Sequence, residues 1–326
     1  EVDYFFIDED RYACSHLDKV LREEGYGDQI GRTIYLRHAK FQDEVTGIID
    51  FIRKKSRRNG RSIFSLDQYG YKEVPTDLIR MIFDNLPRAE IILTFAVDSF
   101  LNFAGGNSLT QDLLGNMGLP DMLQGRTWDE IKNSSKDWRL LIQSTMYRSL
   151  VSRSGAKHYT PFFIRNKKGH GDYWLIHLSQ HHRARDVMTE VHWANNNNFI
   201  HYGGPGLDMF QMIGYDPQID TTFTGQSNLG FEFDDIARKA SIATLNEQIP
   251  RRIYAHDDGV SFGELFVSTC NDSPASAQIY RSSIGELMER RIVEVVSAGG
   301  GTRRSANAIE ASDQIMPPRQ RRLFSR

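Results

Sequence analysis

The chain has 326 residues, a hydrophobic fraction of 40% and a formal net charge of -2. These values exclude a disordered chain, and they exclude a strongly charged surface that would attract nucleic acid or membranes over the whole molecule. No apolar run is long enough to span a bilayer, and the first residues do not form a secretory signal. The two cysteines, Cys14 and Cys270, have no metal-binding spacing. We therefore expect a soluble, cytoplasmic protein.

The first hundred residues alternate strand and helix patterns. Amphipathic segments separate short apolar runs, which is typical of a mostly parallel, doubly wound α/β sheet with helices on both faces. Because Glu1 to Ile7 enter a strand directly, we expect part of the sheet to lie upstream of this chain. The predicted strands cover 4–7, 33–36, 63–66 and 90–96, and the predicted helices cover 11–24, 45–57 and 75–86.

In the middle of the chain, the alternation of strands and helices gives way to polar helical segments. Polar helical segments after Phe103 predict a helical insertion over 104–160. An apolar strand at 173–178 predicts that the sheet resumes within 161–225, and 226–260 are expected to form a linker.

The pattern of residues 261–326 predicts a separate domain. Helices, a strand, the glycine hairpin 299–301 and a second strand follow one another in the order of a winged helix. Arg303 and Arg304 lie beside this hairpin in a locally positive segment. They either contact phosphate or are simply solvated, because winged helices also dock proteins.

The third predicted strand ends in Asp67-Gln-Tyr-Gly-Tyr71. Carboxyl ends of strands in open α/β sheets are where ligands bind, although an Asp after a strand also caps turns and helices. An acid and an aromatic ring can hold an amine in line with an activated methyl group. Asp67 and Tyr69 are therefore candidate catalytic residues.

Asp8 and His38 follow the first two strands. A carboxylate at the first position can hold the ribose hydroxyls of an adenosine cofactor, or it can favour the start of the next helix through the helix dipole. His38 lies in the region that borders an adenine ring. His177, His181 and His182 bring no converging carboxylate, so we expect a polar loop and no metal site there.

Together these segments resemble the three-Cys-motif partner family (TcmP), and the resemblance covers nearly the whole chain. The residues that carry it are Asp67-Gln-Tyr-Gly-Tyr71, Val74-Pro75, Glu90 to Phe95, Tyr173 to Leu178, Met188, Trp193, Phe262 to Phe266, Asn271, Pro274 and Gly285 to Met288.

The resemblance implies a Rossmann-like fold of the S-adenosylmethionine-dependent methyltransferase type, a C-terminal winged helix and a radical-SAM-like partner protein with three cysteines. It implies that Asp8 binds the cofactor, and that Asp67, Tyr69 and Gly70 occupy the family's Asp-Pro-aromatic-Gly turn, in which Gly70 is a further candidate cofactor-binding residue. Gln68 stands where the family usually has proline. The family's glycine-rich loop follows a first strand that lies outside this chain.

Two functions follow. The first is a methyltransferase-like protein acting on nucleic acid or a modified base, in which the winged helix docks the substrate or the partner. The second is a catalytically degenerate scaffold or binding subunit of a multi-protein complex, such as one in phage defence. Gln68 and the absent glycine-rich loop favour the second.

Overall fold

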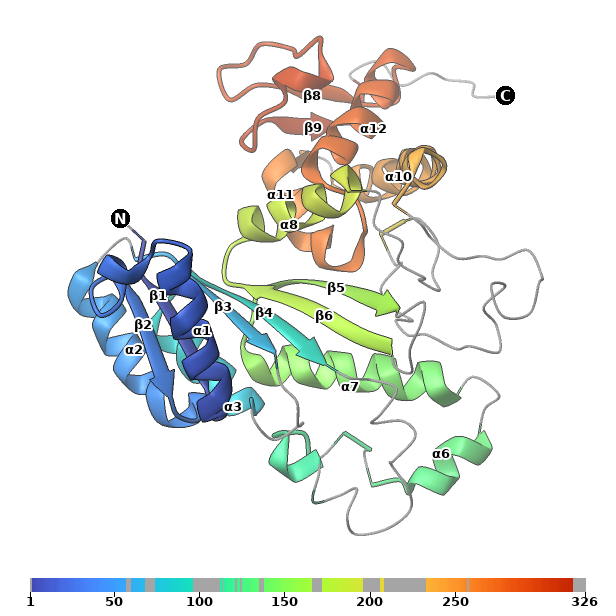
Figure 1. Ribbon diagram of the computed structural model, residues 1–326. Coiled ribbons are helices and arrows are strands. Elements are labelled where there is room, and N and C mark those ends of the chain that lie inside the picture. Colours follow the sequence, from blue (N-terminus) through green and yellow to red (C-terminus); the bar gives the residue numbers. More distant parts are fainter. Residues whose placement is uncertain are drawn as a thin grey trace.

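The structure is a computed structural model. It describes the following ranges: 2–56, 60–67, 74–95, 112, 114–120, 122–123, 125–134, 138–165, 172–195, 206–207, 233–256 and 258–318. Within them, an N-terminal α/β part carries a C-terminal part made of helices and a small sheet (Figure 1).

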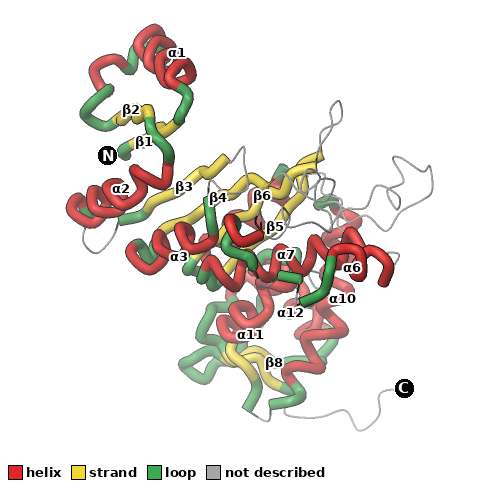
Figure 2. Tube along the Cα trace, turned by 90° about the horizontal axis from the view of Figure 1, so that it is seen from below, coloured by secondary structure: helices red, strands yellow, loops and turns green. Residues whose placement is uncertain are grey.

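The chain begins with a parallel pair of strands. β1 (Tyr4–Asp8) pairs with β2 (Ile34–His38), and Asp8 lies opposite His38 at the carboxyl end. Helix α1 (Arg11–Glu23) and the short turn η1 (Gly27–Gln29) connect the two strands. Figure 2 shows this pair, with α1 and α2 (Phe41–Lys55), beside β3 at one edge of the larger sheet.

The larger sheet has four strands in the order β3-β4-β6-β5. β3 (Ser62–Asp67) and β4 (Ala89–Phe95) are parallel, as predicted. β5 (His158–Arg165) and β6 (Asp172–Ser179) are antiparallel to each other, and β6 is antiparallel to β4. The prediction of a mostly parallel sheet concerned the first hundred residues and did not cover this antiparallel half. Only 166–171 separate β5 from β6, too few for the crossover of a dozen residues that a parallel pair needs.

Helices cover both faces of the four-stranded sheet. In Figure 1, α7 (Trp138–Ser154) lies below the sheet and α8 (His182–Ala194) lies above it. α3 (Thr76–Asn85), which joins β3 to β4, packs against α7. In the expected insertion 104–160 the described residues include α6 (Trp128–Ser134) and α7, and β5 already begins within this range.

The core of this part centres on β4 and β6. Ile91, Leu93 and Phe95 of β4 and Ile176 and Leu178 of β6 are almost fully buried. These five residues are spaced by two along their strands and lie opposite one another, so they share one face of the sheet, and the burial of this face stabilises it. Among the described helices, none is long and apolar enough to cross a bilayer.

The C-terminal part has the order helix, strand, helix, helix, strand, strand. Its small sheet has the antiparallel order β7-β9-β8. The elements are α10 (Asp235–Ile253), β7 (Val260–Ser261), α11 (Phe262–Thr269), η3 (Cys270–Asp272), α12 (Ala277–Glu289), β8 (Glu294–Val296), η4 (Ala306–Ala308) and β9 (Gln314–Met316).

The expected linker 226–260 is corrected by α10. Leu245, Ile249 and Ile253 are fully buried in one cluster with residues of α11 and α12, so α10 is the first helix of the C-terminal part. The sequence hides this face because the same stripe continues through Ala237 and Ser241, which are small and weakly hydrophobic.

Candidate functional site

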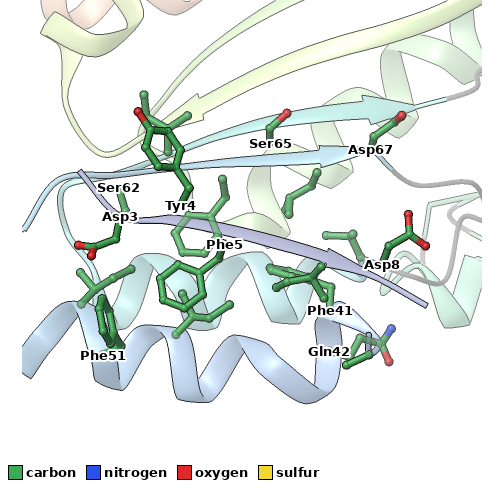
Figure 3. Close-up of a pocket in the computed structure, with 18 of the residues that line it drawn as sticks. Asp3, Tyr4, Phe5, Asp8, Phe41, Gln42, Phe51, Ser62, Ser65 and Asp67 are labelled. Atoms are coloured by element: carbon green, nitrogen blue, oxygen red, sulfur yellow. The ribbon is translucent and has the colours of Figure 1, made fainter. Parts of the chain in front are cut away.

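A groove of about 1840 Å³ lies between the two N-terminal sheets. β1 and β3 form its two sides and run in the same direction, and Asp8 and Asp67 lie at the same end of it (Figure 3). The structure therefore brings together two predicted site residues that are far apart in the sequence. Their position at the carboxyl ends of parallel strands is where ligands bind in open α/β sheets.

Asp8 is held by the turn that follows β1. Its Oδ1 accepts a hydrogen bond from the backbone N–H of Asp10 at 2.7 Å. Asp10, not Asp8, caps α1 by accepting a hydrogen bond from the N–H of Tyr12 at 2.7 Å. No described residue donates to Oδ2 of Asp8, and the side chain is exposed to the groove. Asp8 thus retains an oxygen that can accept hydrogen bonds from a ligand.

His38 occupies the neighbouring strand end. Its Nε2 lies 3.0 Å from the backbone oxygen of Glu9. The side chain is exposed, but it does not line the groove; Ala39, Lys40 and Phe41 do so instead. His38 is therefore beside the candidate site rather than in it.

The start of α2 contributes residues that the sequence analysis did not single out. Phe41 packs edge to face on Phe64, with ring centroids 6.3 Å apart, and the two rings form part of the apolar groove wall. Gln42 adds an amide to the same wall (Figure 3). The sequence indicates Phe41 and Gln42 only through their position shortly after the end of a strand.

Asp67 is the last residue of β3 and is exposed at the groove. It lies opposite Thr94 of β4. Tyr69 and Gly70, the other predicted residues of this turn, lie outside the described residues.

The three histidines considered for a metal have other partners. Nε2 of buried His177 lies 3.0 Å from a carboxylate oxygen of Glu90, and this hydrogen bond lowers the pKa of Glu90. His181 caps α8, because its Nδ1 accepts a hydrogen bond from the N–H of Arg183. The rings of His182 and His181 stack, with their centroids 4.4 Å apart. In the described part of the chain, no cluster of three or more metal-ligating side chains occurs.

A buried polar cluster joins α8 to the C-terminal part. Arg185 is fully buried and donates hydrogen bonds to the backbone oxygens of Ser273 and Ala275. Asp186 accepts one from the N–H of Ala277 at 2.8 Å. Because these contacts involve buried charges, they fix the orientation of α12 relative to α8.

The outer face of α12 is covered by the loop between β8 and β9. Gln278 donates a hydrogen bond to Asn307, and Arg281 donates one to the backbone oxygen of Ile309. A Cβ atom on Gly285 would lie 2.7 Å from the Cβ of Ala306. This close approach requires glycine on α12 and leaves no room for a DNA backbone at the covered face.

The two predicted contact arginines have different environments. Arg303 forms a bidentate pair with fully buried Asp313, with distances of 2.8 and 3.1 Å, and lies 3.5 Å from Glu310. Burial alone would raise the pKa of Asp313, but the hydrogen bonds from Arg303 and from the Glu310 amide hold that pKa below its ordinary value. Arg304 is exposed and makes no ion pair with a described residue. Of the two, Arg304 is the side chain available to a phosphate.

A comparison with protein families identifies the C-terminal part. Residues 214–300 match the family model of the GMT-like wHTH domain. The chain thus contains a winged-helix domain. The match confirms the predicted C-terminal winged helix and extends it over α10, which agrees with the packing of that helix. No curated protein matches the chain.

Within the winged-helix domain, α12 is the third helix. This position belongs to the recognition helix in winged helices that enter the major groove. The loop that covers α12 and the positive side chain of Arg304 lie at the β8–β9 wing. Nucleic acid can therefore reach Arg304 more readily than the covered face of α12.

Proposed function

We propose that this protein is methyltransferase-like, that it binds S-adenosylmethionine at the carboxyl ends of β1 and β3, and that its winged-helix domain docks nucleic acid or a partner protein. The observation that carries the proposal is the position of Asp8 and Asp67 at one end of the groove, on either side of it (Figure 3). The resemblance to the three-Cys-motif partner family supports the same assignment and a Rossmann-like, methyltransferase-type core.

The residues present fit the cofactor. Oδ2 of Asp8 is free to accept hydrogen bonds from ribose hydroxyls, and the apolar wall of Phe41 and Phe64 can cover a flat base. When bound, S-adenosylmethionine supplies a methyl group on a positively charged sulfur. His38 would border the base from outside the groove.

The chain's own role in methyl transfer is to orient an amine. The Asp67 carboxylate would accept a hydrogen bond from the N–H of an amine acceptor and so orient its nitrogen. Tyr69, which lies outside the described residues, is the second proposed catalytic residue and would supply an aromatic ring. Gly70, which also lies outside the described residues, is the proposed cofactor-binding residue of the same turn. Asp67 or water would take the proton that a methylated amine nitrogen must lose.

The winged-helix domain would supply the acceptor. Nucleic acid or a modified base is the proposed substrate class, with Arg304 on a phosphate. A radical-SAM-like protein with three cysteines is the proposed partner under the same resemblance. The buried cluster around Arg185 supports this arrangement, since it holds the domain in a fixed orientation to the sheet.

A scaffold without catalytic activity is the second candidate. It is favoured by the covered face of α12 and by the intramolecular pairing of Arg303, because both leave fewer groups available to contact DNA. In that case the groove would hold no cofactor and the winged helix would bind a subunit of a larger complex.

Calorimetric titration with S-adenosylmethionine separates the two candidates. The protein should bind the cofactor, and Asp8→Ala should weaken binding by about tenfold or more, since a charge-assisted hydrogen bond is lost. Asp28→Ala, at the opposite end of β2, is the matched control. Absence of binding at millimolar cofactor, or equal binding by Asp8→Ala, would reject the enzyme and leave the scaffold.

A further inference from the structure

The carboxyl ends of α10 and α12 meet at one edge of the winged-helix domain. Asn246 of α10 donates a hydrogen bond to Glu286 of α12 at 2.7 Å. Farther along both segments, the hydroxyl of Tyr254 donates one to the backbone oxygen of Ile292 at 2.6 Å. The two helices therefore run in the same direction and end together. We infer that this edge binds single-stranded nucleic acid.

Four exposed arginines lie at this edge, which we call the arginine edge. They are Arg251 and Arg252 in the last turn of α10, and Arg290 and Arg291 directly after α12. None of them forms an ion pair with a described residue, including the carboxylates nearest in the sequence, Glu289, Glu294 and Asp258. Such guanidinium groups can form paired hydrogen bonds with phosphate. Because the helix dipole also favours cations at carboxyl ends, the charge alone does not identify a ligand.

The backbone of Arg291 supplies an independent argument. Its φ of 55° makes it the one non-glycine residue with positive φ in the described part of the chain. Its N–H donates to the oxygen of Met288 and the next N–H donates to that of Leu287, which is the helix ending that glycine usually occupies. A side chain is strained there, and an arginine one turn earlier would suit the dipole without strain. Strain of this kind is typical of functional positions.

Tyr254 indicates the class of ligand. Its side chain is 50% exposed, and the hydrogen bond from its hydroxyl to Ile292 fixes the ring beside Arg291. A ring that is already held in place loses little freedom when a base stacks on it. Stacking on aromatic rings between cationic side chains is how proteins bind single strands. A duplex hides the faces of its bases, and an acidic peptide has no base to stack.

The arginine edge is separate from the surfaces discussed above. Arg304 lies on the β8–β9 wing, and the loop that contains Ala306 covers α12 at Gly285, one turn before the helix ends. The inference goes beyond the proposed function, since it holds whether or not the groove binds S-adenosylmethionine.

Fluorescence anisotropy with a labelled single strand of about 15 nucleotides tests the inference. DNA and RNA strands of one mixed sequence distinguish the two sources of the ligand. We expect Arg291→Gly to weaken binding by about threefold or more and to reduce the salt-dependence slope by about 0.7, because one phosphate contact is lost. The same variant should raise the midpoint of urea unfolding, since glycine relieves the strain. Weaker binding by a more stable protein cannot come from damage to the fold.

Matched variants separate the arginine edge from general attraction between charges. Arg252→Ala should weaken binding as Arg291→Gly does. Arg238→Ala removes the same charge from an exposed position at the opposite end of α10 and should change binding by less than about twofold. Tyr254→Leu should weaken binding by about fivefold or more, whereas Tyr254→Phe keeps the ring and should retain most of the affinity.

Several outcomes would overturn the inference. They are no binding of either strand, equal losses in Arg238→Ala and Arg252→Ala, and displacement of the strand by a DNA duplex as effective as by unlabelled strand. Equally effective displacement by polyglutamate would also overturn it and would assign the edge to an acidic protein. Strand binding by a protein that does not bind S-adenosylmethionine would reject the proposed enzyme and support the arginine edge.

Discussion

Asp186 on α8 accepts a hydrogen bond from the backbone N–H of Ala277 at 2.8 Å, and so caps the third helix of the winged-helix domain from the sheet side. Ser276, the residue at the start of α12, makes no such side-chain cap. The third helix of the domain is therefore stabilised by the α/β part, which ties the two together.

Removing this cap should destabilise the protein. We expect Asp186→Ala to lower the free energy of unfolding by about 2 kcal/mol, because a buried N–H loses a charged acceptor. Asp186→Asn should cost less, since it retains an acceptor oxygen. Urea unfolding monitors both.

Arg183→Ala is the matched control for this cap. It breaks only the outer contact of Asp186, from an arginine whose side chain is 63% exposed, and should cost less than about 1 kcal/mol. Equal losses in Arg183→Ala and Asp186→Ala would show that the hydrogen bond to Ala277 contributes little.

The close contact of α12 with the wing gives a second prediction. Gly285→Ala should destabilise the protein by about 1–3 kcal/mol, because its Cβ would lie 2.7 Å from the Cβ of Ala306. Ala306→Gly removes the opposing atom, so the double variant should recover most of the loss in urea unfolding. A double variant as unstable as Gly285→Ala would show that the wing does not pack as described.

Replacing Arg303 or Arg304 by alanine should affect different properties of the protein. Arg304→Ala should weaken binding to a DNA duplex of about 20 base pairs and reduce the salt-dependence slope by about 1, with stability unchanged. Arg303→Ala should instead cost about 2 kcal/mol of stability, because Asp313 would remain buried without its partner. Fluorescence anisotropy and urea unfolding measure the two effects. Unchanged DNA binding in Arg304→Ala would point to protein docking.

His158 makes stability depend on pH. Burial, followed by the charge of nearby His182, lowers the pKa of His158 from 6.5 to about 4. The unfolded chain therefore binds a proton first as pH falls, so stability present at pH 7 is lost between about 6.5 and 4, by on the order of 3 kcal/mol. His158→Asn should flatten this slope. An unchanged slope in His158→Asn would contradict the assignment.

Local patterns predicted the elements well. The expected strand at 63–66 and helix at 75–86 differ by only one residue at each end from Ser62–Asp67 and Thr76–Asn85. Alternating and helical apolar periods are properties of neighbouring residues, so they can be read without tertiary structure. The same holds for Asp8 and Asp67 at strand ends.

Long-range features escaped prediction. The direction of β6 depends on its hairpin with β5, and α10 was missed because part of its buried stripe is alanine and serine. Arg303 and Arg304 look alike in the sequence, yet only the fold brings Asp313 to Arg303. Contacts between distant segments decide the direction of β6 and the difference between the two arginines.

Photolabelling with methyl-labelled S-adenosylmethionine tests the central claim most directly. Under ultraviolet light, the protein should incorporate label in peptides that contain the carboxyl end of β1 or β3, next to Asp8 or Asp67, and S-adenosylhomocysteine should compete. Label confined to the winged-helix domain, or no label that the competitor removes, would contradict a cofactor site at this end of the groove.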